Sequence, residues 1–235
     1  MPQKKNLLFV YDFPHAKSVD FIHQCVKENI QIDVIVAASH KNIRKTKRAL
    51  NYNKYTTNLE HPRNLASNFN IPYFNCDHNS SEVKRIINEF EINFGIVAGA
   101  RILNKDIIAQ FPYGILNIHP GLLPYNRGLD SILWAIHNNK KIGVSAHLIN
   151  DNIDEGHLVL KQIIEDFKSD SIFDIYRKVY KVQIDLLSKA YNLIGAKINF
   201  RVLKGGDYNT YMPEIIQKKT LNNLKSYIAN YSKIT

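Results

Sequence analysis

Side chains that can donate hydrogen bonds and carry protons are concentrated in the segment NIHPGLLPYNRG, residues 117–128. Asn117 and His119 end the apolar run GILNIH, and a loop with two prolines follows them. Residues two apart on an extended segment point to the same side, so we expect both side chains to face one crevice. An amide N–H can stabilise a developing oxyanion, and an imidazole can do the same or carry a proton.

A carboxylate partner for His119 is available in the later loop NDNIDEG, residues 150–156. The loop offers Asp151, Asp154 and Glu155, and it follows a predicted strand that can lie beside the first. An amide, an imidazole and a carboxylate can therefore converge. The same patterns also occur as a local hydrogen-bonding device at a strand end and as a plain turn, so spacing alone leaves the choice open.

Other kinds of catalytic site have no pattern in this sequence. It contains no Gly-x-Ser-x-Gly, no glycine-rich phosphate loop ending in Lys-Ser/Thr and no metal-spaced His or Cys cluster. We therefore expect no metal. The scattered His137, His147 and His157 are expected to be structural or surface residues, and the solitary Cys25 and Cys76 small buried side chains.

The elements that must position these residues follow from the hydrophobic pattern. Short apolar runs alternate with segments of helical periodicity over the first half of the chain, which predicts an α/β fold with a Rossmann-like, mostly parallel doubly wound sheet. In such a sheet ligands bind at the carboxyl ends of the strands, where Asn117 and His119 stand. The predicted strands cover residues 6–12, 32–38, 94–99, 114–119, 141–149 and 157–166, and a long helix is predicted over 171–196.

One main domain with a C-terminal appendage is predicted. Residues 1–197 form the catalytic domain, and residues 198–235 form a C-terminal appendage with a hairpin around Gly205 and Gly206 and a helix over 221–231. No apolar run is long enough to span a membrane and the N-terminus does not resemble a signal peptide, so we expect a cytoplasmic protein that does not interact with membranes.

The net charge of +10 raises the question of nucleic-acid binding. The densest basic stretch, Lys41–Lys54, is expected to be a solvated face, or alternatively to steer a polyanionic ligand. Nucleic acid is not the expected partner, because only Tyr52 and Tyr55 interleave with these basic residues.

Three segments in this order resemble a known family. VAGARIL, LNIHPGLLPYNRG and GVSAHLINDNIDEG, within residues 94–160, are similar to the formyltransferases that use N10-formyltetrahydrofolate. Their signature is an N-x-H-(P/G)-(S/G)-x-L-P loop followed about thirty residues later by D-x-G. The resemblance implies a formyltransferase with N10-formyltetrahydrofolate as co-substrate.

Residue roles follow from this resemblance position by position. It implies that Asn117, His119 and Asp154 are the catalytic set, because Asp154 occupies the D-x-G position. Folate-binding residues are expected at Ala100, Arg101, Ile102, Leu103, Asn150, Asp151 and Ile153, and substrate-binding residues at Tyr125, Asn126 and Arg127.

The acceptor amine separates three branches of the family. Enzymes that formylate glycinamide ribonucleotide carry a Gly/Ser-rich loop after the first strand, whereas this chain has YDFPHAKS, and enzymes that act on methionyl-tRNA carry a β-barrel larger than the forty or so residues after the long helix. LPYNRGLDSILWAI and GGDYNTYMPEI resemble enzymes acting on nucleoside-diphosphate amino sugars, such as dTDP-amino sugars of O-antigen and lipopolysaccharide biosynthesis. The residues Leu-Asp-Ser after Gly128 depart from that branch.

We therefore expect an enzyme that formylates a nucleotide-linked amino sugar and forms a homodimer. A protein that binds folate, a nucleotide or RNA without catalysis is the alternative from another class.

Overall fold

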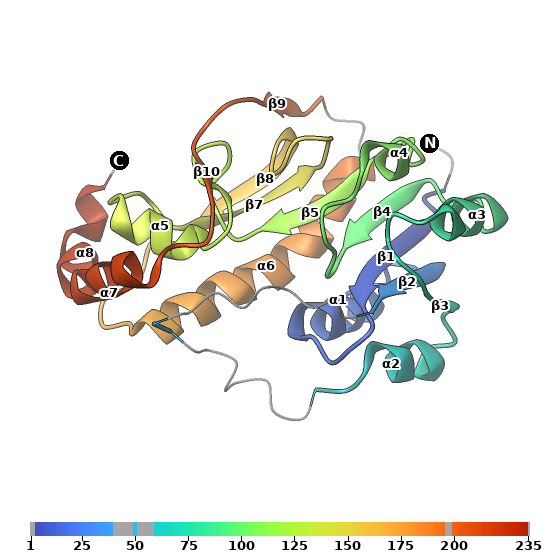
Figure 1. Cartoon of the computed structure of the whole chain (residues 1–235), viewed down its shortest axis with the longest axis horizontal. Helices are drawn as coiled ribbons and strands as arrows, with labels where there is room; N and C mark the ends of the chain where they lie inside the picture. The colour runs from blue at the N-terminus through green and yellow to red at the C-terminus, as the bar shows by residue number, and fades with distance from the viewer. Residues whose placement is uncertain (1–2, 40–48, 51–58, 196–198, 235) are drawn as a thin grey trace.

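A sheet of eight strands forms the centre of the part of the chain that the computed structural model describes, which is residues 3–39, 49–50, 59–195 and 199–234 (Figure 1). The strand order is β3-β2-β1-β4-β5-β7-β8-β9. The strands are β1 (Asn6–Tyr11), β2 (Val34–Ala38), β3 (Tyr73–Asn75), β4 (Phe94–Val97), β5 (Ile115–His119), β7 (Gly143–Leu148), β8 (Gly156–Ile163) and β9 (Arg201–Leu203).

The first five strands of the sheet are parallel, and the predicted Rossmann-like α/β class is confirmed. β7 pairs antiparallel with β5, and β8 and β9 continue antiparallel. No helix lies between β7 and β8, whose connection is the loop NDNIDEG. A connection this short can only reverse the chain, and it starts beside β5, where β7 places Leu148 opposite Leu116 and His147 opposite Asn117.

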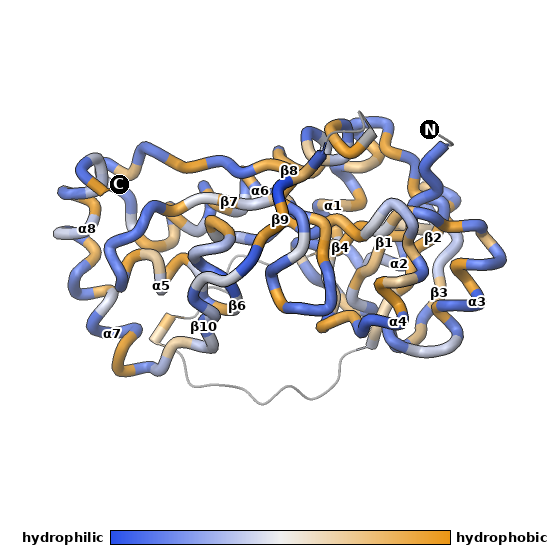
Figure 2. The backbone as a smooth tube through the Cα atoms, turned by 90° about the horizontal axis from the view of Figure 1, so that it is seen from above, coloured by the Kyte–Doolittle hydropathy of each residue, from blue (hydrophilic) through white to orange (hydrophobic). Residues whose placement is uncertain are grey.

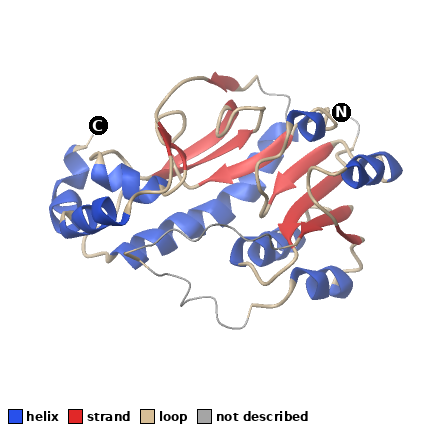
Figure 3. Ribbon diagram, viewed as in Figure 1, coloured by secondary structure: helices blue, strands red, loops and turns tan. Residues whose placement is uncertain are grey.

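Helices cover both faces of the sheet, as the blue and red ribbons of Figure 3 show. On one face Leu8 and Val10 pack against α1 and α6, while on the other Leu7 and Phe9 pack against α3 and α4. This is the period of two expected for a strand buried on both faces. The helices are α1 (Ala16–Lys27), α2 (Pro62–Asn68), α3 (Ser81–Glu89), α4 (Lys105–Ile108), α5 (Ser131–His137) and α6 (Ile172–Gly195).

Hydrophobic side chains on the helices recur at helical spacing. Val83, Ile86 and Ile87 are the buried residues of α3, and in Figure 2 the tube along this helix changes between hydrophobic and hydrophilic segments. The long helix α6 packs against α1, β5, β7 and β8. It therefore runs beneath the strand ends at which the predicted site lies.

The C-terminal segment differs from the predicted hairpin. Its two strands do not pair with each other: β9 joins the edge of the main sheet beside β8, while β10 (Tyr208–Asn209) pairs in parallel with β6 (Arg127–Gly128). The chain therefore crosses from the sheet edge to the loop that follows β5. Gly206 permits this crossing, since a Cβ there would lie 1.7 Å from the Pro124 carbonyl oxygen.

The helical part of the C-terminal appendage is present as two helices rather than one. They are α7 (Glu214–Asn222) and α8 (Leu224–Asn230). Tyr231 follows them and is buried, and its hydroxyl accepts a hydrogen bond from the Ile142 amide and donates one to the Ile164 carbonyl, each at 2.8 Å. These bonds join Tyr231 to the residue before β7 and to the residue after β8.

Two predictions stay open. Most of the basic stretch Lys41–Lys54 lies outside the described residues. The division into domains at residues 197 and 198 stays a prediction.

Candidate active site

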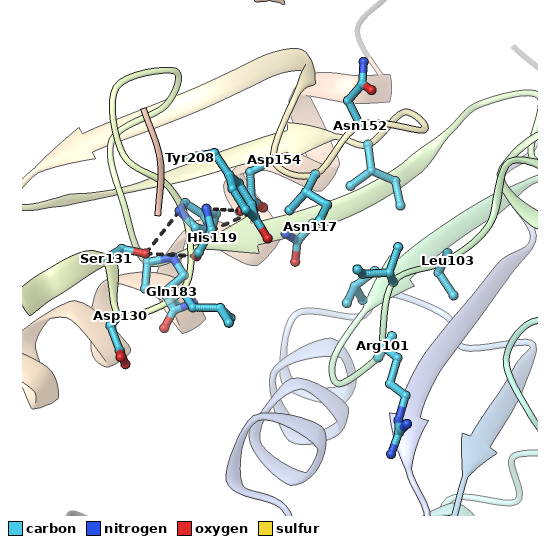
Figure 4. A pocket seen from close by; sticks show the side chains of 18 of the residues that line it. Arg101, Leu103, Asn117, His119, Asp130, Ser131, Asn152, Asp154, Gln183 and Tyr208 are labelled. Atoms are coloured by element: carbon cyan, nitrogen blue, oxygen red, sulfur yellow. Dashed lines mark hydrogen bonds and ion pairs between the residues drawn. The ribbon is translucent and has the colours of Figure 1, made fainter. Parts of the chain in front are cut away.

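A cavity of about 520 Å³ lies at the carboxyl ends of β4 and β5 (Figure 4). The β4–α4 loop and the β7–β8 loop form one half of its wall, which we call the loop half. The start of α5, one face of α6 and β10 form the other half, which we call the helix half. Asn117 and His119 lie where the two halves meet.

The structure brings the predicted catalytic residues together. The Asp154 carboxylate lies 3.4 Å from Nδ1 of His119, and both side chains line the cavity together with Asn117. Asn117 and His119 come from the end of β5, and Asp154 comes from the β7–β8 loop, because β7 lies beside β5. The catalytic role of the three residues stays a prediction, but their convergence is a property of the structure.

Both ring nitrogens of His119 face acceptors. Nε2 lies 2.8 Å from the Asn126 carbonyl oxygen, and Nδ1 faces the Asp154 carboxylate. A carbonyl can only accept, so Nε2 is a donor. His119 is therefore held between a carbonyl oxygen and a carboxylate oxygen where the two halves of the cavity meet.

The carboxylate of Asp154 is fixed by backbone geometry. Its Oδ2 accepts a hydrogen bond from the Gly128 amide at 2.7 Å, while Oδ1 faces the imidazoles of His119 and His147. Asp154 has φ 52° and Gly156 has φ 99°, where a Cβ would lie 2.0 Å from the Leu148 carbonyl oxygen. The D-x-G spacing thus reflects a turn that only glycine can complete at its third position.

Glycine is also required beside His119. A Cβ on Gly121 would lie 2.7 Å from His119 Nε2 and 2.7 Å from the Asn126 carbonyl oxygen. Any side chain at this position would break the hydrogen bond between them. The HPG sequence therefore keeps the imidazole in place.

The loop half contains every residue predicted to bind folate. It combines apolar side chains, such as Leu103 and Ile149, with the backbone groups of two loops. A wall of this kind suits a flat ring with a polar edge. The predicted residues that line the cavity are Ala100, Arg101, Ile102, Leu103, Asn150, Asp151 and Ile153.

The three residues predicted to bind substrate do not line this cavity, which differs from the expectation. Tyr125 is 60% exposed, Asn126 is buried with its amide donating to the Ser131 carbonyl, and Arg127 forms an ion pair with Glu155 at 2.8 Å. Arg127 also donates to the Ile153 carbonyl at 3.0 Å. Its charge is therefore used inside the protein to hold the β7–β8 loop, and its role with a diphosphate stays a prediction.

The helix half contains residues that the sequence did not single out. Ser131 begins α5, Tyr176, Tyr180 and Gln183 lie on one face of α6, and Tyr208 comes from β10. The helical spacing 176, 180 and 183 was visible in the sequence, but nothing there indicated that this face meets the crevice. Tyr208 is 50% exposed and lines the same cavity as His119 and Asp154 (Figure 4).

His147 is a further residue that the sequence analysis assigned to a structural or surface role. It is 0% exposed and lies directly opposite Asn117 in the ladder between β5 and β7. Its Nε2 is 3.2 Å from Asn117 Nδ2. No signal in the sequence indicated this role, because it depends on β7 lying antiparallel to β5 with His147 opposite Asn117.

Lys17 on α1 contacts the backbone between Asn117 and His119. Its ammonium donates a hydrogen bond at 3.0 Å to the carbonyl of Ile118, the residue between Asn117 and His119, and Gln183 donates to the same oxygen at 2.9 Å. Burial lowers the pKa of Lys17 to about 8, and the nearby Asp154 carboxylate partly opposes this shift. Side chains from two helices thus hold the peptide between Asn117 and His119.

The turn YDFPHAKS has a structure unlike a phosphate loop. The imidazole of His15 caps α1 by accepting a hydrogen bond from the Ser18 amide, and burial lowers the pKa of His15 to about 4. The Ser18 amide at the start of α1 therefore donates to a neutral side chain of the protein, where it could otherwise donate to an anion.

Within the described ranges, no group of three or more His, Cys, Asp or Glu side chains is placed to hold a metal ion. No helix of the described chain has the length and apolar character needed to cross a membrane.

Comparison with known proteins agrees with the resemblance. A model of the formyl transferase family matches residues 5–191. Formyltetrahydrofolate deformylase from Escherichia coli K12 is 27% identical over 146 residues, which is 58% of this chain and 52% of that protein. The chain thus spans about half the length of the curated relatives that it matches.

Solved structures share the fold. A sugar N-formyltransferase from a Shewanella species has a TM-score of 0.61 at 24% identity, covering 88% of this chain and 77% of that one. Phosphoribosylglycinamide formyltransferase from Anaplasma phagocytophilum has a TM-score of 0.64 at 16% identity, covering 88% of this chain and 98% of that one.

Proposed function

The chain belongs to the formyl transferase family, and from this membership we propose that it transfers a formyl group from N10-formyltetrahydrofolate to the amine of a nucleoside-diphosphate-linked amino sugar. The observation that carries the transfer chemistry is the convergence of Asn117, His119 and Asp154 between the two halves of one cavity. A two-substrate reaction needs such an arrangement, because the reacting atoms of both substrates must meet at one catalytic group.

In this proposal the folate occupies the loop half of the cavity. The backbone groups of residues 100–103 and 150–153 bind the edge of the pterin, and Leu103 and Ile149 pack against its faces. The formyl group then reaches the junction of the halves beside Asn117 and His119.

The amine attacks the formyl carbon from the helix half. The new N–C bond places negative charge on the former carbonyl oxygen, which the Asn117 amide stabilises by a hydrogen bond and the His119 imidazolium by its charge. Asp154 holds that imidazolium and accepts the proton of the attacking amine through water. The bond from carbon to N10 then breaks, N10 receives a proton, and tetrahydrofolate leaves.

The sugar acceptor rests on the composition of the helix half. Tyr176 and Tyr208 offer aromatic surface, and Asp130 and Gln183 offer polar groups for hydroxyl hydrogens. Rings flanked by hydrogen-bonding side chains suit a pyranose better than a compact phosphate.

Glycinamide ribonucleotide is less well supported as the acceptor. The His15 cap occupies the helix start at which a phosphate would bind. Methionyl-tRNA and water remain competing acceptors, the latter because a relative is a deformylase. Binding of folate, a nucleotide or RNA without catalysis is the competing proposal from another class.

A turnover screen tests the proposal. Purified protein and N10-formyltetrahydrofolate are mixed with thymidine- and uridine-diphosphate amino sugars, glycinamide ribonucleotide or methionyl-tRNA, and a sample without amine measures hydrolysis. Release of tetrahydrofolate and mass spectrometry of the formylated product are followed. Turnover of a sugar nucleotide alone supports the proposal, whereas turnover of another acceptor, or equal release without amine, contradicts it.

Three further expectations belong to this proposal. A cytoplasmic location, a homodimer and a role in polysaccharide synthesis stay predictions. Light scattering at several protein concentrations tests the dimer, and a mass of one chain throughout would contradict it.

A further inference from the structure

His147 is buried at the site without belonging to the predicted catalytic set. It is 0% exposed and lies on β7, directly across the ladder from Asn117 on β5. A fully buried imidazole needs partners for both ring nitrogens. These partners determine its tautomer.

The first partner is a backbone carbonyl. Nδ1 of His147 lies 2.8 Å from the carbonyl oxygen of Glu155, in the loop that carries Asp154. A carbonyl has no proton to give, so Nδ1 carries the proton and donates. In a neutral ring Nε2 is then an acceptor.

The second partner is the amide of Asn117. Its Nδ2 lies 3.2 Å from Nε2 of His147. Because Nε2 is an acceptor, the amide must present its NH₂ group, since a flipped amide would set Oδ1 against the lone pair of Nε2. The proton on Nδ1 of His147 therefore determines the orientation of the Asn117 amide, because it makes Nε2 an acceptor.

The charged groups around His147 are consistent with a neutral ring. Asp154 lies 3.8 Å from Nε2 and favours protonation, whereas burial and the nearby His119 and Lys17 oppose it. The net effect lowers the pKa of His147 to about 4.

We propose that His147 is a positioning residue that holds the Asn117 amide with one N–H on its own Nε2 and the second N–H directed at the formyl oxygen. The inference rests on the proposed function for its consequence in catalysis, but its structural content can be measured in the free protein. An amide free to rotate would present its oxygen to the developing oxyanion part of the time, and oxyanion stabilisation requires donors that are oriented beforehand.

The first test is the tautomer in the wild-type protein without substrates. A long-range ¹H–¹⁵N spectrum at pH 7 should show His147 protonated on Nδ1 and unprotonated on Nε2. An imidazolium, or a proton on Nε2, would overturn the proposal. This measurement does not depend on the acceptor or on turnover, so it separates failure of this inference from failure of the proposed function.

The second test uses variants and the rates of formyl transfer. His147→Leu removes the acceptor for Asn117 and should lower kcat about 100-fold, in the range found when one oxyanion donor is lost, with KM for the folate changed less than twofold. His147→Gln retains an acceptor near the position of Nε2 and should recover at least tenfold over the leucine variant. A leucine variant with unchanged kcat, or a glutamine variant without recovery, would contradict the proposal.

A double-variant cycle shows through which residue His147 acts. Asn117→Ala with His147→Leu should be no more than about threefold slower than Asn117→Ala alone, because residues that act through one another are not additive. If the decrease in kcat of the double variant equals the product of the decreases in the two single variants, the positioning role is wrong. Thr220→Val, which removes a buried hydroxyl bonded to His137 outside the cavity, is the control for packing defects. If the leucine variant does not fold, the tautomer measurement and the glutamine variant still test the proposal.

Discussion

Replacing Asp154 by Asn tests how much of the rate depends on the charge beside His119. The substitution retains the size of the side chain and an oxygen that can accept from the Gly128 amide, and asparagine tolerates the left-handed backbone at φ 52°. What it removes is the negative charge 3.4 Å from Nδ1 of His119. At an effective dielectric constant of about 20, this attraction amounts to about 5 kcal/mol.

Part of this attraction is already present before the reaction and does not lower the activation barrier. We therefore expect kcat to fall about 1,000-fold, equivalent to about 4 kcal/mol. The assay is release of tetrahydrofolate at saturating substrates, with urea unfolding to establish that the variant is as stable as the wild type. Asp207→Asn, which removes an exposed charge paired with Lys140, is the matched control. A kcat for the Asp154 variant within tenfold of wild type would refute the electrostatic argument.

Three further predictions concern the walls of the site. Tyr208→Ala removes aromatic surface from the helix half and should raise KM for the acceptor about tenfold with KM for the folate unchanged; equal effects on both constants would contradict the division of the cavity. Gly156→Ala should lower the free energy of unfolding by about 3 kcal/mol or more in urea titrations, because its Cβ would overlap the Leu148 carbonyl; a loss below about 1 kcal/mol would argue against the turn. Burial lowers the pKa of Lys17 from 10.5 to about 8, so the unfolded chain binds more protons between these values and stability rises with pH across them. Lys17→Met should therefore be about 1–3 kcal/mol more stable than wild type at pH 7, with a difference that narrows by pH 10, and a difference independent of pH would refute this.

The parallel part of the fold was predictable because its signal is local. Strands buried on both faces are continuous apolar runs, and the helices between them repeat their apolar residues at three and four. The convergence of Asn117, His119 and Asp154 was expected from the N-x-H and D-x-G motifs of the resemblance, and in the structure it arises because β7 lies antiparallel beside β5.

The helix half of the cavity was not predictable, because its geometry depends on contacts between distant segments. β10 pairs with β6 across about eighty residues of sequence, and nothing in either two-residue strand identifies its partner. The ion pair of Arg127 was not predictable for a related reason: a guanidinium attracts a diphosphate or an internal carboxylate equally well, and Glu155 is a carboxylate within reach.

The parallel pairing of β10 with β6 also has a consequence for how the protein is made. The ribosome releases β5, the β7–β8 loop and α6 before Tyr208 appears. A nascent chain therefore contains Asn117, His119 and Asp154 before it contains β10, so the wall that β10 forms is added to the cavity after them. A chain interrupted in this interval would hold the trio with one side uncovered.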